Sequence, residues 1–235
     1  MNLRRTLHGA LLLALIALLT GGCRGALDAH SPEAARIETL WWVMLWISIA
    51  VFIIVVALLA YALFRPRGAT SVIDAPHRSF LFVTIGGGAI PLVILAVVFA
   101  YSIVVMAESR PDDPDRMRID VMARQFSYEV TYPNGATTMN ELRLPLGREV
   151  ELALRSEDVI HSFWVPQLNG KTDFVPGITN HISITPSRVG TYRGQCGEFC
   201  GVGHADMVIH VIVEEPAAFA RWLDEQSAHP PRAVR

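Results

Sequence analysis

Two long apolar runs constrain the fold of this chain more than any other feature of its sequence. Residues 40–64 and 80–106 contain no Asp, Glu, Lys or Arg. A helix rises about 1.5 Å per residue, so each run is long enough to cross a hydrocarbon core of about 30 Å. A soluble helix of this length and uniformity is unusual. We therefore expect two transmembrane helices.

The short segment between the two runs predicts their orientation. It carries Arg65, Arg67 and Arg78 against a single acidic residue, Asp74. By the positive-inside rule this loop lies in the cytoplasm, and both flanks lie on the outer face. We expect a helical hairpin with residues 107–235 on the outer face of the membrane.

Aromatic and small residues within the two runs indicate how the hairpin contacts the membrane interface and neighbouring helices. Trp41, Trp42 and Trp46 near the start of the first run are typical of an interfacial aromatic belt. The second run contains Gly86–Gly88 and Pro91. Such residues are tolerated in a membrane when neighbouring helices pack against them, so we expect a larger integral partner.

The N-terminus has the pattern of an export signal. Residues 1–22 combine a basic start, an apolar core and a small-residue end, which predicts a secretory signal peptide. Cys23 follows directly, in an imperfect resemblance to the lipobox of bacterial lipoproteins. The alternatives are lipidation at Cys23, or cleavage near Ala26 or Ala29 with loss of the cysteine. Residues 23–39 are expected on the outer face.

The second half of the chain has the pattern of a small β domain. A Pro-punctuated linker at 107–116 leads into a domain at 117–215, and about 100 residues in such a pattern are typical of a β-sandwich or a Greek-key barrel. A helix is expected at 216–226, within a C-terminal helix and tail at 216–235. The expected strands are 118–123, 126–132, 149–155, 181–185 and 208–213.

Charge is divided unevenly along the chain. Residues 1–107 carry seven arginines and four acidic residues, whereas residues 108–235 carry 13 basic and 18 acidic residues. An acidic outer half argues against nucleic acid as a partner and favours a basic one. The three cysteines are too few for a disulfide scaffold.

One glycine-rich loop carries the residues with distinctive chemistry. Cys196, Cys200, His204 and Met207 follow one another at spacings of four, four and three between two expected strands. Thiolate, imidazole and thioether form a soft donor set that favours copper over magnesium, calcium or manganese. Taken singly, the two cysteines suit a disulfide, the histidine a surface position and the methionine the core. Their occurrence together in one short loop favours a metal site.

A second histidine extends this set of donors. His161 lies upstream of the loop, in the sequence Asp158-Val-Ile-His-Ser. Two cysteines, two histidines and one methionine exceed the ligands of a single blue-copper ion of the His₂Cys-Met kind. Two thiolates can bridge two metals and leave one histidine for each, so the residues favour a dinuclear copper site.

The motif C-x-E-x-C-x₃-H-x₂-M, with the upstream D-x-x-H-S, resembles subunit II of the haem–copper cytochrome c oxidases over nearly the whole chain. This resemblance implies a membrane-anchored α+β chain, in which the hairpin precedes an all-β cupredoxin-like Greek-key barrel. It also implies a dinuclear CuA centre, whose two copper ions are bridged by both cysteine sulfurs. The implied copper ligands are His161, Cys196, Glu198 (through its backbone carbonyl), Cys200, His204 and Met207. The Glu198 side chain would hold a magnesium or manganese ion at the border with subunit I.

The function implied by the resemblance is electron entry into a terminal respiratory oxidase. Cytochrome c would deliver electrons to the copper centre, which would pass them to the haem of subunit I for reduction of O₂ to water, coupled to proton translocation. Subunits I and III are the expected membrane partners, and no catalytic residue is expected in this chain. The alternatives are the CuA-containing subunit of a haem–copper nitric oxide reductase and a membrane-tethered copper-binding or copper-delivery protein.

Two positions depart from the family pattern. The family segment Q-W-x-W-x-Y-x-Y is here Gln125-Phe-Ser-Tyr-Glu-Val-Thr-Tyr132. Phe126 therefore replaces the tryptophan that accepts electrons from cytochrome c, and Tyr128 replaces the second tryptophan. Strand packing and a role in electron entry are equal alternatives for both residues. Thr84 stands where the family places a glutamate at a proton-pathway entrance.

Docking of the electron donor is expected to be electrostatic. Glu157 and Asp158 stand just before His161 in the acidic outer half. The family resemblance places Asp158 in the docking surface for cytochrome c. For Glu157 the alternative is an ordinary solvated loop.

Overall fold

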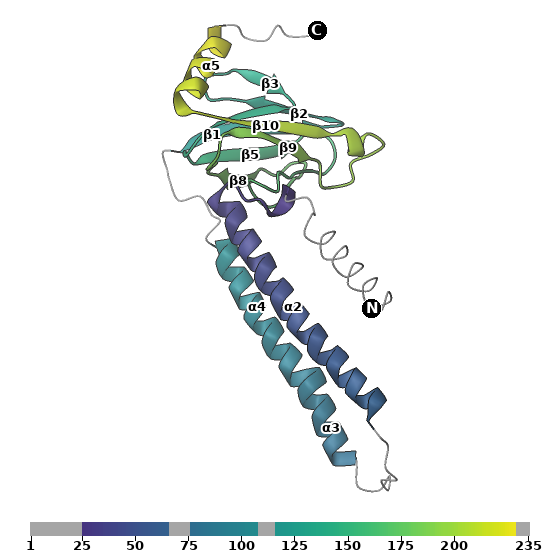
Figure 1. Cartoon of the computed structure of the whole chain (residues 1–235). Coiled ribbons are helices and arrows are strands. Elements are labelled where there is room, and N and C mark those ends of the chain that lie inside the picture. The colour runs from purple at the N-terminus through teal and green to yellow at the C-terminus, as the bar shows by residue number, and fades with distance from the viewer. Residues whose placement is uncertain (1–24, 66–75, 108–115, 229–235) are drawn as a thin grey trace, which may run out of the picture.

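The computed structural model of the 235-residue chain describes residues 25–65, 76–107 and 116–228. Two long helical rods lie side by side and extend from one end of a β domain, and a short C-terminal helix lies at the opposite end (Figure 1). The predicted signal peptide at 1–22 and the predicted lipidation site Cys23 lie outside the described residues, as does most of the predicted linker.

The first membrane helix, α2 (Pro32–Phe64), starts before the predicted apolar run. Ser31 caps its N-terminus by accepting the N–H of Ala34 at 2.9 Å, and Pro32 occupies the first turn, where its missing N–H costs nothing. This capping explains why the helix includes polar residues upstream of residue 40. Its apolar side chains are largely exposed, and the helix is long and apolar enough to cross a membrane.

The second apolar run is helical but not uniform. It comprises α3 (Pro76–Thr84), a π-helical turn η3 (Ile85–Ala89) and α4 (Ile90–Ala107). Pro91 has no N–H with which to bond the carbonyl of Gly87. The N–H of Ile90 bonds to the carbonyl of Ile85, five residues back, as in a π-helix. The proline and the glycines thus widen one turn without ending the helix. Residues 80–105 also meet the length and apolarity of a membrane span.

The start of α2 is joined to the β domain by buried polar contacts. The Ser31 hydroxyl donates to the carbonyl of Leu168, and the Glu33 carboxylate accepts from the Thr185 hydroxyl at 3.0 Å. Ser31 and Glu33 are both buried. The membrane hairpin and the domain therefore share a hydrogen-bonded junction at one end of the sheets.

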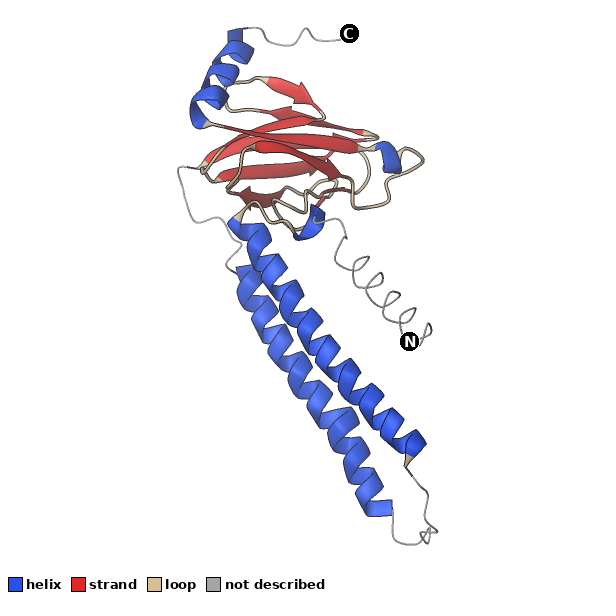
Figure 2. Ribbon diagram, viewed as in Figure 1, coloured by secondary structure: helices blue, strands red, loops and turns tan. Residues whose placement is uncertain are grey.

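The described part of the β domain contains ten strands in three sheets (Figure 2). The strand orders are β3-β2-β1-β5-β8, β4-β10-β9 and β6-β7. The pairs β1–β5 and β4–β10 are parallel, so the two larger sheets are mixed. The strands are β1 (Met117–Arg124), β2 (Ser127–Thr131), β3 (Thr137–Met139), β4 (Glu141–Pro145), β5 (Val150–Ser156), β6 (His161–Phe163), β7 (Thr172–Phe174), β8 (Asn180–Ile184), β9 (Gly190–Gln195) and β10 (Val208–Glu214).

The hairpin and the cupredoxin-like domain were both predicted, and the structure confirms them. The strands form separate mixed sheets rather than one closed barrel. All five predicted strands are present as β1, β2, β5, β8 and β10. The inward-facing side chains of the sheets form one core, which includes Tyr128, Phe163, Phe174 and Met207. The core reaches the loop that carries the predicted metal ligands.

The predicted C-terminal helix is α5 (Pro216–Ala228). Phe219 is buried and lies 6.4 Å from the ring of Tyr132, while Trp222 contacts the same tyrosine edge-on at 4.9 Å. These aromatic contacts cover the end of the domain that is remote from the membrane hairpin (Figure 1).

Candidate metal centre

The loop between β9 and β10 carries most of the predicted copper ligands. Antiparallel pairing of Gln195 with Val208 brings the two ends of the loop together. The N–H of Cys196 then donates to the carbonyl of Met207 at 3.0 Å, which closes the base of the loop. The first and last predicted ligands of the loop are thus held side by side by backbone geometry.

The sulfur atoms of this loop converge. The Sγ of Cys200 lies 3.9 Å from the Sγ of Cys196 and 3.9 Å from the Sδ of Met207. The Nδ1 of His204 lies 3.8 Å from the same Cys200 sulfur. A disulfide bond would require about 2.05 Å between the sulfurs, and both cysteines are free. The disulfide alternative for these two cysteines is therefore wrong in this structure.

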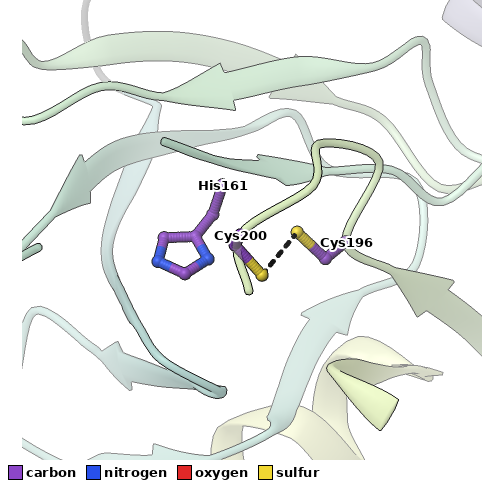
Figure 3. A group of neighbouring side chains, drawn as sticks. All are labelled: His161, Cys196 and Cys200. Atoms are coloured by element: carbon purple, nitrogen blue, oxygen red, sulfur yellow. Dashed lines mark hydrogen bonds between the residues drawn. The ribbon is translucent and has the colours of Figure 1, made fainter. Parts of the chain in front are cut away.

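His161 reaches the cluster from a different sheet. It begins β6, its side chain is fully buried, and one of its ring nitrogens and the two cysteine sulfurs lie within 4.8 Å of one another (Figure 3). Its Nε2 is held 2.8 Å from Oδ1 of Asp158. Its Nδ1 is buried and has no hydrogen-bond partner within the described part of the chain. An unpaired buried nitrogen is costly, so this atom fits a metal ligand.

The Asp158 carboxylate is engaged within the domain. Besides His161, it accepts the backbone N–H of Gln125 at 2.8 Å and that of Val159 at 2.6 Å. Burial opposes its ionisation, but the hydrogen bonds from His161 and from the two backbone groups outweigh burial and lower its pKa. Only 31% of its side chain is exposed. Asp158 therefore orients a predicted ligand, whatever part it takes in docking.

Burial keeps the Cys200 thiol protonated when no metal is bound. Desolvation, followed by the charge of the neighbouring Cys196, raises the pKa of Cys200 to about 11. Because a thiolate is the form that ligates, metal binding through Cys200 must displace its proton. The donor set of two thiols, two imidazoles and a thioether fits copper.

Glu198 lies between the two cysteines, and its backbone carbonyl and its side-chain carboxylate contact different residues. Its backbone carbonyl lies 3.1 Å from the Sγ of Cys196, whereas its carboxylate pairs with the ammonium group of Lys171. Lys171 also contacts Asp173 at 2.8 Å, and its hydrogen bonds to Asp173 and Glu198 raise its pKa. A divalent cation on the Glu198 carboxylate would have to displace the Lys171 ammonium group.

The two aromatic residues that replace the family tryptophans occupy different environments. Phe126 is half-buried, and a Cβ built on Gly203 would lie only 2.5 Å from its ring. Tyr128 is fully buried and donates to the carbonyl of Ser162 at 2.9 Å. Burial is the main cause of its raised pKa, and the nearby Cys196 adds to the effect. Phe126 thus covers the ligand loop at the surface, while Tyr128 lies beneath the site.

Two residues that contact the site were not predicted from the sequence. The Gln125 side-chain amide donates to the carbonyl of Cys200, and Lys171 packs so closely that a Cβ on Gly197 would lie 2.8 Å from its Cδ. Neither residue type is a distinctive metal or redox signal. Only the family segments that contain them could have drawn attention to these positions.

Comparison with known proteins identifies the family of this chain. The family model for the periplasmic domain of cytochrome c oxidase subunit II matches residues 120–214. The cytochrome c oxidase subunit 2 of Alkalihalophilus pseudofirmus is 32% identical over 244 residues, which cover 97% of this chain and 71% of that protein. The chain belongs to the cytochrome c oxidase subunit II family.

Other members of the subunit II family match parts of the chain. The cytochrome c oxidase subunit 2 of Thermostichus vulcanus is 41% identical over 111 residues, covering 47% of this chain and 33% of that protein. The crystal structure of the periplasmic domain of subunit II from Bradyrhizobium japonicum covers 50% of this chain and 96% of its own, with 26% identity and a TM-score of 0.47.

Family membership confirms several predictions. The chain is a subunit II of a haem–copper terminal oxidase, with membrane helices and a cupredoxin-like domain whose family implies a CuA copper site. The buried group of His161, Cys196 and Cys200 lies where that site is expected. As an oxidase subunit, the chain works with other subunits of that complex.

Proposed function

We propose that this subunit II is the entry point for electrons into its oxidase, accepting them from cytochrome c and passing them to the haem of subunit I. Oxygen would be reduced to water in the partner subunit, with proton translocation. One observation carries this proposal: two free thiols, an imidazole and a thioether from one loop converge beside the buried ring of His161, whose Nδ1 lacks a partner among the described residues.

Six groups would hold the two copper ions. They are the side chains of His161, Cys196, Cys200, His204 and Met207, with the backbone carbonyl of Glu198. When bound, the copper pair would supply one-electron oxidation and reduction shared over two metals. The chain's own part is to hold these donors in one arrangement in both oxidation states.

Several contacts support a rigid site. The base of the loop is closed between Cys196 and Met207, and the His161 ring is fixed by Asp158. The Gln125 amide holds the carbonyl of Cys200. Because electron transfer is opposed by any change in ligand geometry, a loop anchored at these points favours rapid transfer. It also needs no open position for a substrate.

We extend the proposal to the surroundings of the subunit. The hairpin would cross the inner membrane of a bacterial cell twice, with the arginine-rich loop in the cytoplasm and the β domain in the periplasm. A cleaved signal peptide, with lipidation at Cys23, would precede it. The Glu198 carboxylate would exchange Lys171 for a magnesium or manganese ion at the border with subunit I, and subunit III would complete the complex.

Rapid mixing of the oxidised, purified oxidase with reduced cytochrome c tests the proposed order of electron flow. We expect the copper absorption of this subunit to change before that of the haems. In Cys196→Ser, haem reduction by cytochrome c should be slowed by orders of magnitude. The matched control is Ser127→Ala, a half-buried position on β2. Haem reduction at the wild-type rate in Cys196→Ser would refute the proposal.

A further inference from the structure

We propose that Tyr128 is a positioning residue of the copper site, and that its buried hydroxyl sets the reduction potential by joining the strand of His161 to the Cys196 sulfur. This inference rests on the proposed function, because it concerns the site through which electrons would enter. It differs from both roles expected for Tyr128 from the sequence, which were strand packing and direct electron entry.

The backbone of Tyr128 is fixed on β2 by Asn140. Its N–H donates to the side-chain oxygen of Asn140 at 2.8 Å, and its carbonyl accepts the Asn140 N–H at 2.8 Å. Asn140 has a left-handed backbone with a φ of 57°, a conformation that asparagine adopts more readily than most residues. The fully buried Tyr128 side chain therefore enters the core from an anchored point.

The Tyr128 side chain contacts the strand pair that carries His161 at two points. Its hydroxyl donates to the carbonyl of Ser162, the residue after this ligand, at 2.9 Å. Its ring packs against Phe174, with the ring centroids 5.6 Å apart. Phe174 is the partner of His161 in the antiparallel pairing of β6 with β7. Both contacts thus act on the backbone that orients His161.

The same hydroxyl lies beside the ligand loop. Burial is the main cause of the raised pKa of Tyr128, and the charge of Cys196 and its hydrogen bond with the tyrosine raise that pKa further. The phenol proton therefore has two acceptors within reach, the Ser162 carbonyl and the Cys196 sulfur. Because both residues are buried, water competes little for these contacts. One hydroxyl thus connects the two parts of the domain that supply His161 and Cys196.

The residue type matters at this position. A phenol hydroxyl rotates about its C–O bond and can be shared between two acceptors, whereas the tryptophan of the family pattern has one N–H fixed in its ring plane. Phenylalanine would fill the same space and bond neither acceptor. Hydrogen bonds around a cysteine ligand tune the potential of a copper site. A donor at the sulfur stabilises the electron-rich, reduced centre, so the Tyr128 hydroxyl raises the potential.

Redox titration and electron paramagnetic resonance of the complete oxidase test this proposal in Tyr128→Phe. Loss of the hydroxyl should lower the reduction potential, so that the equilibrium constant for reduction of the copper centre falls about fivefold. The copper hyperfine pattern should also change, while both copper ions stay bound. The matched control is Tyr132→Phe, which removes a buried hydroxyl that accepts the Arg143 N–H at 2.7 Å, on a ring that contacts α5. This control should leave the potential and the spectrum unchanged.

Tyr128→Trp is the second variant, because tryptophan is the residue of the family pattern at this position. It decides the question if Tyr128→Phe fails to fold or to bind copper. One fixed N–H should not reproduce both contacts, so the potential of Tyr128→Trp should also fall below that of the wild type.

Three results would overturn this proposal. The first is a wild-type potential and spectrum in either Tyr128 variant, and the second is an equal shift of the potential in Tyr132→Phe. The third is an unchanged potential with slower reduction by cytochrome c, which would assign Tyr128 to electron entry. The proposed function fails separately, if the wild-type centre takes no electrons from cytochrome c, because the potential is measured with chemical mediators and needs no protein donor.

Discussion

The Oδ1 of Asp158 lies 2.8 Å from the Nε2 of the fully buried His161, while the Nδ1 of the same ring has no hydrogen-bond partner among the described residues and the ring lies beside the two cysteines (Figure 3). A carboxylate on the far nitrogen of a ligand histidine fixes the tautomer and the orientation of the ring and raises its basicity. The aspartate of the D-x-x-H-S motif thus acts on the proposed copper site through one hydrogen bond.

Replacing Asp158 by Asn should raise the reduction potential of the copper centre. The amide oxygen can still accept the His161 N–H, but the negative charge that favours the oxidised, more positive centre is gone. A redox titration of the purified oxidase measures this shift. An unchanged potential together with a raised KM for cytochrome c would show that Asp158 serves docking alone.

Replacing Met207 by Leu should change the potential and leave much of the copper bound. Met207 is fully buried, and a swap of similar volume costs less than about 1.5 kcal/mol of stability. The thioether is the weakest donor of the set, so its loss should not empty the site. Metal analysis and redox titration measure the outcome, with the exposed Met139→Leu as the matched control. Complete loss of copper in Met207→Leu would contradict the assigned role.

The pH dependence of copper uptake follows from the protonation of the Cys200 thiol. Burial and the adjacent Cys196 raise the pKa of Cys200 to about 11, so the metal-free thiol is protonated at neutral pH. Copper binding should therefore release protons, and copper affinity should fall as the pH is lowered. Isothermal titration calorimetry in buffers of different ionisation enthalpy measures the released protons. Affinity independent of pH would contradict thiolate ligation.

The same shift predicts how the metal-free protein responds to alkali. A pKa raised above the ordinary value of 9.0 stabilises the folded state below pH 9, and this contribution is lost as the pH rises toward 11. The metal-free protein should thus lose thermal stability between pH 9 and 11, whereas Cys200→Ser should lose less. Equal losses in both proteins would show that another group is responsible.

The junction between the hairpin and the domain should depend on Ser31. Its hydroxyl caps α2 and donates to the carbonyl of Leu168 in the segment that follows β6. Ser31→Ala should cost about 1–2 kcal/mol of stability and speed hydrogen exchange around Leu168. Ser48→Ala is the matched control, because the Ser48 hydroxyl donates to the carbonyl of Met44 within its own helix. Equal protection of Leu168 in both variants would contradict the role of Ser31.

The features that could be predicted from the sequence were those that depend on residues close together in the chain. The hairpin followed from two charge-free runs, and the ligand loop from the spacing of its donors. The start of α2 at Pro32 was missed because capping by Ser31 extends the helix beyond the apolar run. Strands β6 and β7 were missed because each has only three residues, and neither alternates between apolar and polar positions.

The contacts that complete the site depend on pairings far apart in the chain. Gln125 reaches Cys200 across 75 positions, and Lys171 reaches Glu198 across 27. Asp158 was expected at a docking surface because the family resemblance places it there, but the sequence does not show which groups its carboxylate binds. Such relationships follow from the packing of β1, β6 and the ligand loop against one core.

Electron paramagnetic resonance of the oxidised, copper-loaded full-length subunit tests the central claim most directly. If the paired thiols of Cys196 and Cys200 hold a dinuclear centre, the spectrum should show one unpaired electron coupled to two copper nuclei, with two copper ions per chain. A spectrum of one electron on a single copper nucleus, with one copper ion per chain, would contradict the account.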